Sequence, residues 1–139
     1  MLNESLTESS TPEEYAKILR GRYVTDITVS SDETSATITL DNGTTLELIG
    51  SWGCSCGNGA TYIREVFQQG NRTARIMNAR VETTQNDERY DETNYNIFVM
   101  IDGNPTQLPL ARLQGYDDNG YYGTGFNLFI RPAKTADRN

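Results

Sequence analysis

The two cysteines of the chain, Cys54 and Cys56, lie one residue apart in the glycine-rich stretch GSWGCSCGNG, residues 50–59. The same stretch contains the single tryptophan, Trp52. Cysteine sulfur can bind zinc, form a disulfide or act as a nucleophile once it is deprotonated. This spacing therefore suggests three kinds of site, and each has further requirements that the rest of the sequence can be checked against.

The residues around this pair do not complete any of these sites. A structural zinc ion takes about four nitrogen or sulfur ligands, so the pair would need a second chain at a dimer seam, or carboxylates such as Asp41 or Glu47. A disulfide between residues i and i+2 would be strained and easily reduced. No lysine or arginine lies between Ile49 and Ile63 to lower a thiol pKa. We therefore interpret the stretch as a structural turn with free thiols, and zinc at a dimer seam or a redox role are the alternatives.

A second candidate stretch is GYDDNGYYGTGF, residues 115–126. Its acidic residues do not follow the D-x-[DN]-x-[DN]-G pattern of a calcium loop. Its tyrosines suit a recognition surface, because tyrosine provides a large contact area at a small entropic cost. The alternative is a tyrosine-rich hairpin packed on the rim of a sheet. The predicted binding surface consists of Trp52, Tyr116, Tyr121, Tyr122 and Phe126.

Composition narrows the possible functions. The chain has no histidine, which excludes a Ser–His–Asp triad, a Cys–His pair and histidine metal ligands. We therefore expect a protein that is not an enzyme and binds no cofactor. The formal net charge of −7 disfavours non-specific binding to nucleic acid or to anionic membranes.

The sequence also gives expectations about location. No apolar run reaches the roughly 18 residues of a transmembrane helix. The opening residues MLNESLTESS are acidic and polar, unlike a signal peptide, which is basic and then apolar. We therefore expect the protein to stay in a cytoplasm and not to associate with membranes.

The clearest helix signal is TPEEYAKILRG, residues 11–21. Thr11 suits the N-cap, Pro12 suits the first helical position, and Glu14 completes a capping box. Tyr15, Ile18 and Leu19 share one apolar face. The ten residues before this helix are expected to form a polar arm.

The period of the apolar residues changes to two after this helix, which indicates strands. In SATITLDNGTTLELIG, residues 35–50, a three-residue loop pairs Ile38 with Leu46 and Ala36 with Leu48. Only this register gives one continuous apolar face. We therefore predict a hairpin whose Gly43 is in the left-handed region.

Further strands are expected along the rest of the chain. Residues 22–30 should place Val24 on one face and Tyr23, Ile27 and Val29 mostly on the other. Residues 60–67 are expected to be a strand or a short irregular segment. In 73–83 Met77, Ala79 and Val81 should face one way. Residues 84–94 should be a solvated loop.

The run 94–103 is expected to be a central strand with Tyr95, Ile97, Val99 and Ile101 on one face. The segment 107–116 contains a proline and is expected at an edge. The last strand, within 123–132, should direct Phe126, Leu128 and Ile130 inward.

Together these elements predict an α+β, mostly β domain. An N-terminal amphipathic helix is followed by a curled antiparallel sheet, or a small sandwich or barrel, of about six to eight strands. The expected organisation is a polar arm over residues 1–10, a single domain over 11–132 and a polar tail over 133–139.

The order of several motifs resembles a family of unknown function that is common in bacteriophages and prophages. These motifs are GRYVTDITVS, TITLDNGTTLEL, two close cysteines and NGYYGTGF, spread over about residues 21–131. In the family the two cysteines are adjacent, and the residues before them often include a histidine. Here Ser55 separates the two cysteines, and Ser51-Trp52-Gly53 precedes them. The resemblance implies a phage origin and a small β-rich domain, and it implies no activity.

We therefore expect a phage-encoded, non-enzymatic module that binds a host or phage protein. It would act in the cytoplasm of an infected bacterial host, and it could form homo-oligomers. One alternative is a virion component, such as a capsid-decorating or tail-associated protein. The other is a protein that binds a small nucleotide-like ligand or acts on it as an enzyme. The last of these would use Tyr121, Tyr122, Arg64 and Asp117.

Overall fold

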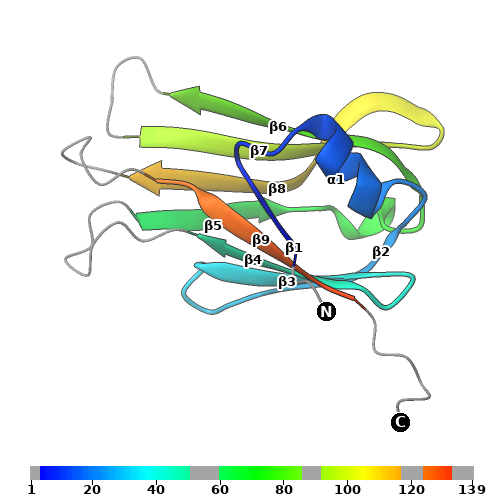
Figure 1. Cartoon of the computed structure of the whole chain (residues 1–139), viewed down its shortest axis with the longest axis horizontal. Coiled ribbons are helices and arrows are strands. Elements are labelled where there is room, and N and C mark those ends of the chain that lie inside the picture. Colours follow the sequence, from blue (N-terminus) through cyan, green and yellow to red (C-terminus); the bar gives the residue numbers. More distant parts are fainter. Residues whose placement is uncertain (1–3, 51–59, 86–91, 117–123, 133–139) are drawn as a thin grey trace, which may run out of the picture.

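The computed structural model describes residues 4–50, 60–85, 92–116 and 124–132 (Figure 1). Within them lie one α-helix, one 3₁₀ turn and nine strands. In chain order these elements are β1 (Glu4–Thr7), α1 (Pro12–Leu19), β2 (Val24–Val29), β3 (Ser35–Leu40), β4 (Thr45–Gly50), β5 (Ala60–Val66), η1 (Gln69–Asn71), β6 (Ile76–Gln85), β7 (Glu92–Ile101), β8 (Asn104–Tyr116) and β9 (Phe126–Arg131).

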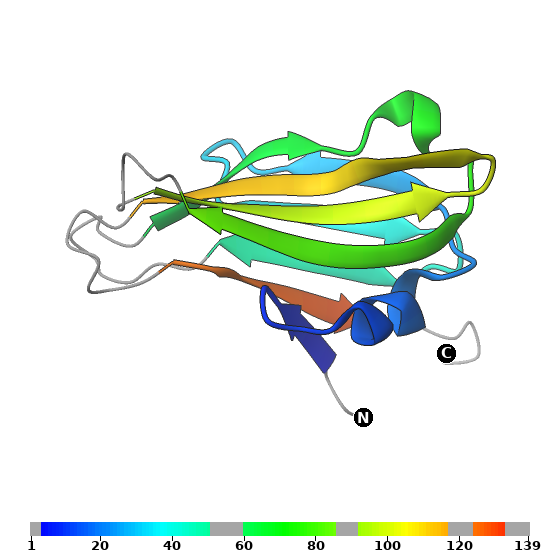
Figure 2. The same ribbon diagram turned by 90° about the horizontal axis from the view of Figure 1, so that it is seen from above.

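The strands form two antiparallel sheets, which face each other in two layers (Figure 2). The five-stranded sheet has the order β1-β9-β4-β3-β2, and the four-stranded sheet has the order β5-β8-β7-β6. The mostly β prediction is confirmed. In the described part of the chain the strands form open sheets and not a closed barrel.

One apolar core lies between the two sheets, because each contributes one face of its alternating side chains. In β7 the side chains of Tyr95, Ile97, Val99 and Ile101 are all buried, as predicted, and β7 is a central strand. In β9 Phe126, Leu128 and Ile130 are buried, also as predicted. The core thus joins the two layers into a single unit.

The hairpin of β3 and β4 has the predicted register. Ile38 lies opposite Leu46, and Ala36 lies opposite Leu48. Gly43 has a φ of 87°, in the left-handed region that glycine adopts at little cost. The alternation of the strands and the chemistry of the turn agree here, so local sequence is enough to specify the pairing.

Helix α1 has the predicted capping box, in which Thr11 Oγ1 accepts from the Glu14 amide and a Glu14 carboxylate oxygen accepts from the Thr11 amide. The helix is short, and it packs on β6 through buried Tyr15, Ala16 and Leu19. It is not the first element, because residues 4–7 of the expected arm form β1, which pairs with β9.

No helix among the described residues is long and apolar enough to span a membrane.

Two expected strand faces are wrong in part, because a bulge near the start of each strand changes the alternation. In β6 the register shifts between Ile76 and Asn78, so Ile76 is buried and Met77 is 46% exposed. In β2 the shift lies between Val24 and Asp26, and Val24 and Ile27 then face the core together, opposite Leu40 and Ile38. An extra residue in one strand reverses the face of every residue on one side of it.

Strand β8 is not at an edge, which corrects the expectation from its proline. It lies between β5 and β7. Ile97 pairs with Ala111 and Phe98 with Pro109, so Leu110 is the additional residue of a bulge. A bulge is one of the few places where proline fits inside a sheet. At the ends of the expected loop at 84–94, residues 84–85 belong to β6 and residues 92–94 belong to β7, while residues 86–91 lie outside the described residues.

The bulge in β6 predicts different effects for two neighbouring substitutions. Ile76→Ala should lower the free energy of unfolding by about 2–5 kcal/mol, because it leaves a cavity in the core. Met77→Ala should change it by less than about 0.5 kcal/mol, because that side chain is largely exposed. Urea denaturation of both variants measures the difference. Equal losses, or a larger loss for Met77→Ala, would show that the strand faces are assigned wrongly.

Candidate functional site

Two predicted functional segments lie outside the described residues, and the strands that flank them meet at one end of the sandwich. The residues outside are Trp52, Cys54, Cys56, Asp117, Tyr121 and Tyr122. Gly50 pairs with Phe126, and Ala60 pairs with Tyr116. The chain therefore leaves and re-enters the two sheets at neighbouring strand ends (Figure 1). We call this end, formed by Gly50, Ala60, Tyr116 and residues 124–126, the loop end.

Glycines allow close contacts between backbone segments at the loop end. A Cβ atom at position 50 would overlap the carbonyl oxygen of Thr61, which belongs to the other sheet. A Cβ atom at position 115 would lie 2.5 Å from the Cβ of Thr124. The buried Thr61 hydroxyl accepts a hydrogen bond from the Gly125 amide at 3.2 Å. The glycines are therefore needed for the two sheets to meet here.

Tyr95 and Glu8 fix the start of β9 at the same end. The Tyr95 hydroxyl lies 2.5 Å from the hydroxyl of Thr124, and its ring packs edge-on against Phe126 with centroids 6.0 Å apart. The Glu8 carboxylate accepts from the Phe126 amide at 3.0 Å. These contacts fix the start of β9, at the end of the predicted tyrosine-rich segment.

Neither buried tyrosine is suited to proton transfer near neutral pH. Burial raises the pKa of Tyr95, and the nearby Glu8 carboxylate raises it further. Burial also raises the pKa of Tyr15, with smaller contributions from Glu8 and Glu14. The Tyr15 hydroxyl donates to the Thr7 carbonyl at 2.8 Å. Both phenols therefore stay protonated and act as structural hydrogen-bonding groups.

Phe126 does not belong to a binding surface, which corrects one of the expected surface residues. Its side chain is 1% exposed and forms part of the core. The sequence suggested a surface position because the ring follows a run of glycines and tyrosines. The alternation within β9 directs it inward instead.

Tyr116 lies in an ordered cluster on the outer face of the four-stranded sheet, at the loop end. The rings of Tyr62 and Tyr116 have centroids 6.4 Å apart. The Arg64 guanidinium lies 5.2 Å from the first ring and 5.9 Å from the second. Its Nε donates to Gln114 Oε1 at 3.2 Å, and its Nη1 donates to Glu33 Oε1 at 3.3 Å. We call Tyr62, Arg64 and Tyr116 the tyrosine–arginine cluster.

The cluster was only partly predictable. Tyr116 was expected on a binding surface, and Arg64 was named for a nucleotide-like ligand. Tyr62 and the support from Glu33 were missed, because the positions are far apart in sequence. The pairing of β5 with β8 places Tyr62 opposite Gln114, next to Tyr116.

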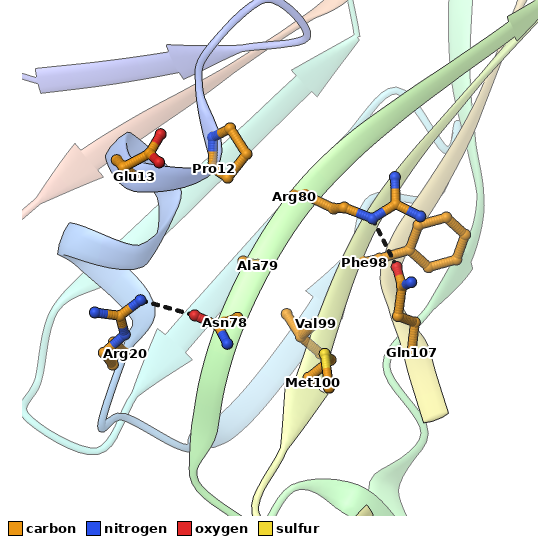
Figure 3. A pocket seen from close by; sticks show the side chains of 10 residues that line it. All are labelled: Pro12, Glu13, Arg20, Asn78, Ala79, Arg80, Phe98, Val99, Met100 and Gln107. Carbon is orange, nitrogen blue, oxygen red and sulfur yellow. Dashed lines mark hydrogen bonds between the residues drawn. The ribbon is translucent and has the colours of Figure 1, made fainter. Parts of the chain in front are cut away.

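A separate groove of 220 Å³ lies between α1 and the outer face of β6 and β7 (Figure 3). Phe98, Met100 and Pro12 provide apolar surface, and the guanidinium groups of Arg20 and Arg80 lie on opposite sides. Arg20 Nε donates to the Met77 carbonyl at 2.9 Å. No sequence motif indicated this groove, because it forms only when α1 packs on β6.

Arg80 is oriented by neighbouring strands of the same sheet. Its guanidinium lies 5.2 Å from the ring centroid of Phe98, and its Nε donates to Gln107 Oε1 at 2.8 Å. A guanidinium held in this way loses less entropy when it binds a carboxylate.

In the described residues, no three cysteine, aspartate or glutamate side chains come together as a metal site.

Comparison with known families gives one match. A family model described as "Domain of unknown function (DUF7448)" matches residues 17–128. The match begins within α1 and ends within β9, so it covers most of both sheets and both predicted segments. No curated protein and no solved structure matches the chain.

The contact between the sheets predicts a position-specific effect of adding one methyl group. Gly50→Ala should lower the free energy of unfolding by about 1–3 kcal/mol or more, because the new Cβ overlaps the Thr61 backbone. Gly70→Ala is the matched control, since a Cβ there meets no atom within 4 Å. It should change stability by less than about 0.5 kcal/mol in the same denaturation assay. Similar losses in both variants would argue against the close contact.

Proposed function

This chain belongs to the family described as a domain of unknown function (DUF7448), and we propose that it is a non-enzymatic module that binds a host or phage protein through its loop end. The proposed contact surface combines the tyrosine–arginine cluster with the two adjoining segments, 51–59 and 117–123. It would include Trp52, Tyr121 and Tyr122.

The position of the two segments supports the proposal. Both connect strands of a sandwich that shares one core, at neighbouring strand ends. Binding residues often lie on loops that a rigid scaffold positions. Tryptophan, tyrosine and arginine are the residue types that most often dominate the energy of protein interfaces. The proposed surface contains six such residues, namely Trp52, Tyr62, Arg64, Tyr116, Tyr121 and Tyr122.

The tyrosine–arginine cluster is the observation that carries the proposal. Its two rings are partly exposed, and the guanidinium over them is held by Gln114 and Glu33. Such side chains lose little conformational entropy when a partner covers them. The net charge of −7 also favours a protein partner over a nucleic-acid backbone.

The phage setting of the proposal rests on the sequence resemblance described above. A host or phage partner would place the protein in the cytoplasm of an infected bacterium. A virion component is the competing function. Mass spectrometry of purified particles separates the two, because a capsid-decorating or tail-associated protein must be present in them.

Removal of these tyrosine rings should weaken binding without unfolding the protein. In Tyr62→Ala/Tyr116→Ala and in Tyr121→Ala/Tyr122→Ala, affinity for the partner should fall by about tenfold or more, because each pair removes interface anchors. The partner is first captured by crosslinking in infected and uninfected cells. The purified candidate is then titrated in a calorimeter with each variant.

Tyr23→Ala is the matched control for these variants. Tyr23 also has an arginine over its ring, with Arg75 at 5.2 Å. It adjoins Asp41, at the opposite end of the β3–β4 hairpin from Gly50. The control should bind normally. Full binding by both tyrosine-pair variants, or the same loss in the control, would refute the proposal.

A further inference from the structure

The groove beside α1 brings apolar and polar side chains together on the outer face of the four-stranded sheet. Asn78 of β6 pairs with Met100 of β7, and Arg80 pairs with Phe98. These side chains point away from the core, because Val99, which lies between Phe98 and Met100, is buried. The groove therefore combines apolar side chains from β7 with polar ones from β6 (Figure 3).

The apolar part of the groove is only partly covered by the fold. Phe98 and Met100 are half-buried, although they belong to a central strand of the sheet. Pro12, at the start of α1, adds apolar surface to the same groove. A concave site of this kind, with a few polar groups that orient the ligand, is typical of small-molecule binding.

The charged groups of the groove favour an anion. Arg20 and Arg80 face one carboxylate among the groove residues, that of Glu13. Arg20 forms no ion pair within the described chain. Instead it donates to the Met77 carbonyl at 2.9 Å and to Asn78 Oδ1 at 2.7 Å. The groove thus has an excess of positive charge, in a chain whose net charge is −7.

Arg80 has donors that a carboxylate can reach. Its Nε donates to Gln107 Oε1 at 2.8 Å, and its guanidinium lies 5.2 Å from the ring centroid of Phe98. Its Nη1 lies 3.8 Å from Glu82 Oε2, which is longer than a hydrogen bond. Its Nη2 makes no hydrogen bond to another described residue. The guanidinium is therefore held in place, while Nη1 and Nη2 can donate to one carboxylate through two parallel hydrogen bonds.

The size and the borders of the groove limit what can enter it. Its volume of 220 Å³ lies below the roughly 300–1,000 Å³ of pockets for drug-sized ligands. Helix α1 packs against β6, and Arg20 contacts the Met77 carbonyl and Asn78. These contacts cover the edge of β6 here, so an extended peptide has no path along it. The groove therefore suits a compact free molecule.

We propose that this groove binds a small organic acid with an apolar body, such as one aromatic ring on a short carboxylate chain. In this complex the ring packs against Phe98 and Met100, and the carboxylate accepts two hydrogen bonds from Arg80. Arg20 adds positive charge on the opposite side of the groove. The site uses no residue of the loop end, so the inference does not depend on the proposed protein partner.

A titration of the full chain with hydrocinnamate, a phenyl ring on a propionate chain, tests the site near neutral pH. Isotope-labelled protein is followed by NMR, which reports the backbone amides around the groove and the Nε–H of Arg80. Their shifts should saturate with a dissociation constant of about 1 mM, as expected for so small a ligand. Hydrocinnamamide, the neutral analogue, should bind about tenfold or more weakly, because it lacks the charged acceptor.

Two variants locate the carboxylate. Arg80→Gln removes the charged fork, so the dissociation constant for hydrocinnamate should rise by about tenfold or more. Arg112→Gln is the matched control, because it makes the same change in net charge on the outer face of β8. Arg112 contacts Glu65 at 3.4 Å there and does not line the groove. This control should bind like the wild type.

The amide spectrum of each variant also checks that it is folded. The absence of saturable shifts up to about 20 mM hydrocinnamate would overturn the proposal. So would equal binding of the acid and the amide, or saturation only at residues outside the groove. A folded Arg80→Gln variant that binds as tightly as the wild type would overturn it as well.

Discussion

The structure depends on the contact between its two sheets where β4 ends and β5 begins. Gly50 lies so close to the Thr61 carbonyl that no side chain fits between them. The buried Thr61 hydroxyl in turn holds the Gly125 amide, next to the start of β9. This close contact brings the two layers together at one end, next to the core side chains that pack between both inner faces. The geometry of the loop end depends on the same contact between Gly50 and Thr61.

Much of the fold could be predicted from local patterns, and the errors have a common physical cause. The β3–β4 hairpin and the central strand β7 were predicted correctly, because simple alternation holds along their whole length. The faces of β2 and β6 were wrong at Val24 and Met77, and β8 was placed at an edge. In each of these strands the pairing register shifts at a bulge. A bulge depends on the partner strand, so a pattern within one strand does not show it.

The candidate site could be predicted only in part, for a related reason. Composition indicated the segments around Trp52 and Tyr121, and it suggested Tyr116 as a residue of the binding surface; the structure leaves Tyr116 partly exposed. It placed Phe126 on the same surface, although the alternation of β9 buries that ring. The contacts of Arg64 with Glu33 and Gln114 join strands that are distant in the chain. Only the pairing of those strands brings such residues together.

The pairing of β1 with β9 has a consequence for the order in which the chain can fold during synthesis. β9 lies between β1 and β4, so the earliest strand and the second strand of the β3–β4 hairpin both wait for the last strand to be made. Glu8 meets the Phe126 amide across 118 positions of sequence. The edges of β4 and β1 that pair with β9 therefore stay open until the ribosome has passed residue 131. Contacts of such long range slow folding, and a nascent chain must keep these open strand edges from other chains in the meantime.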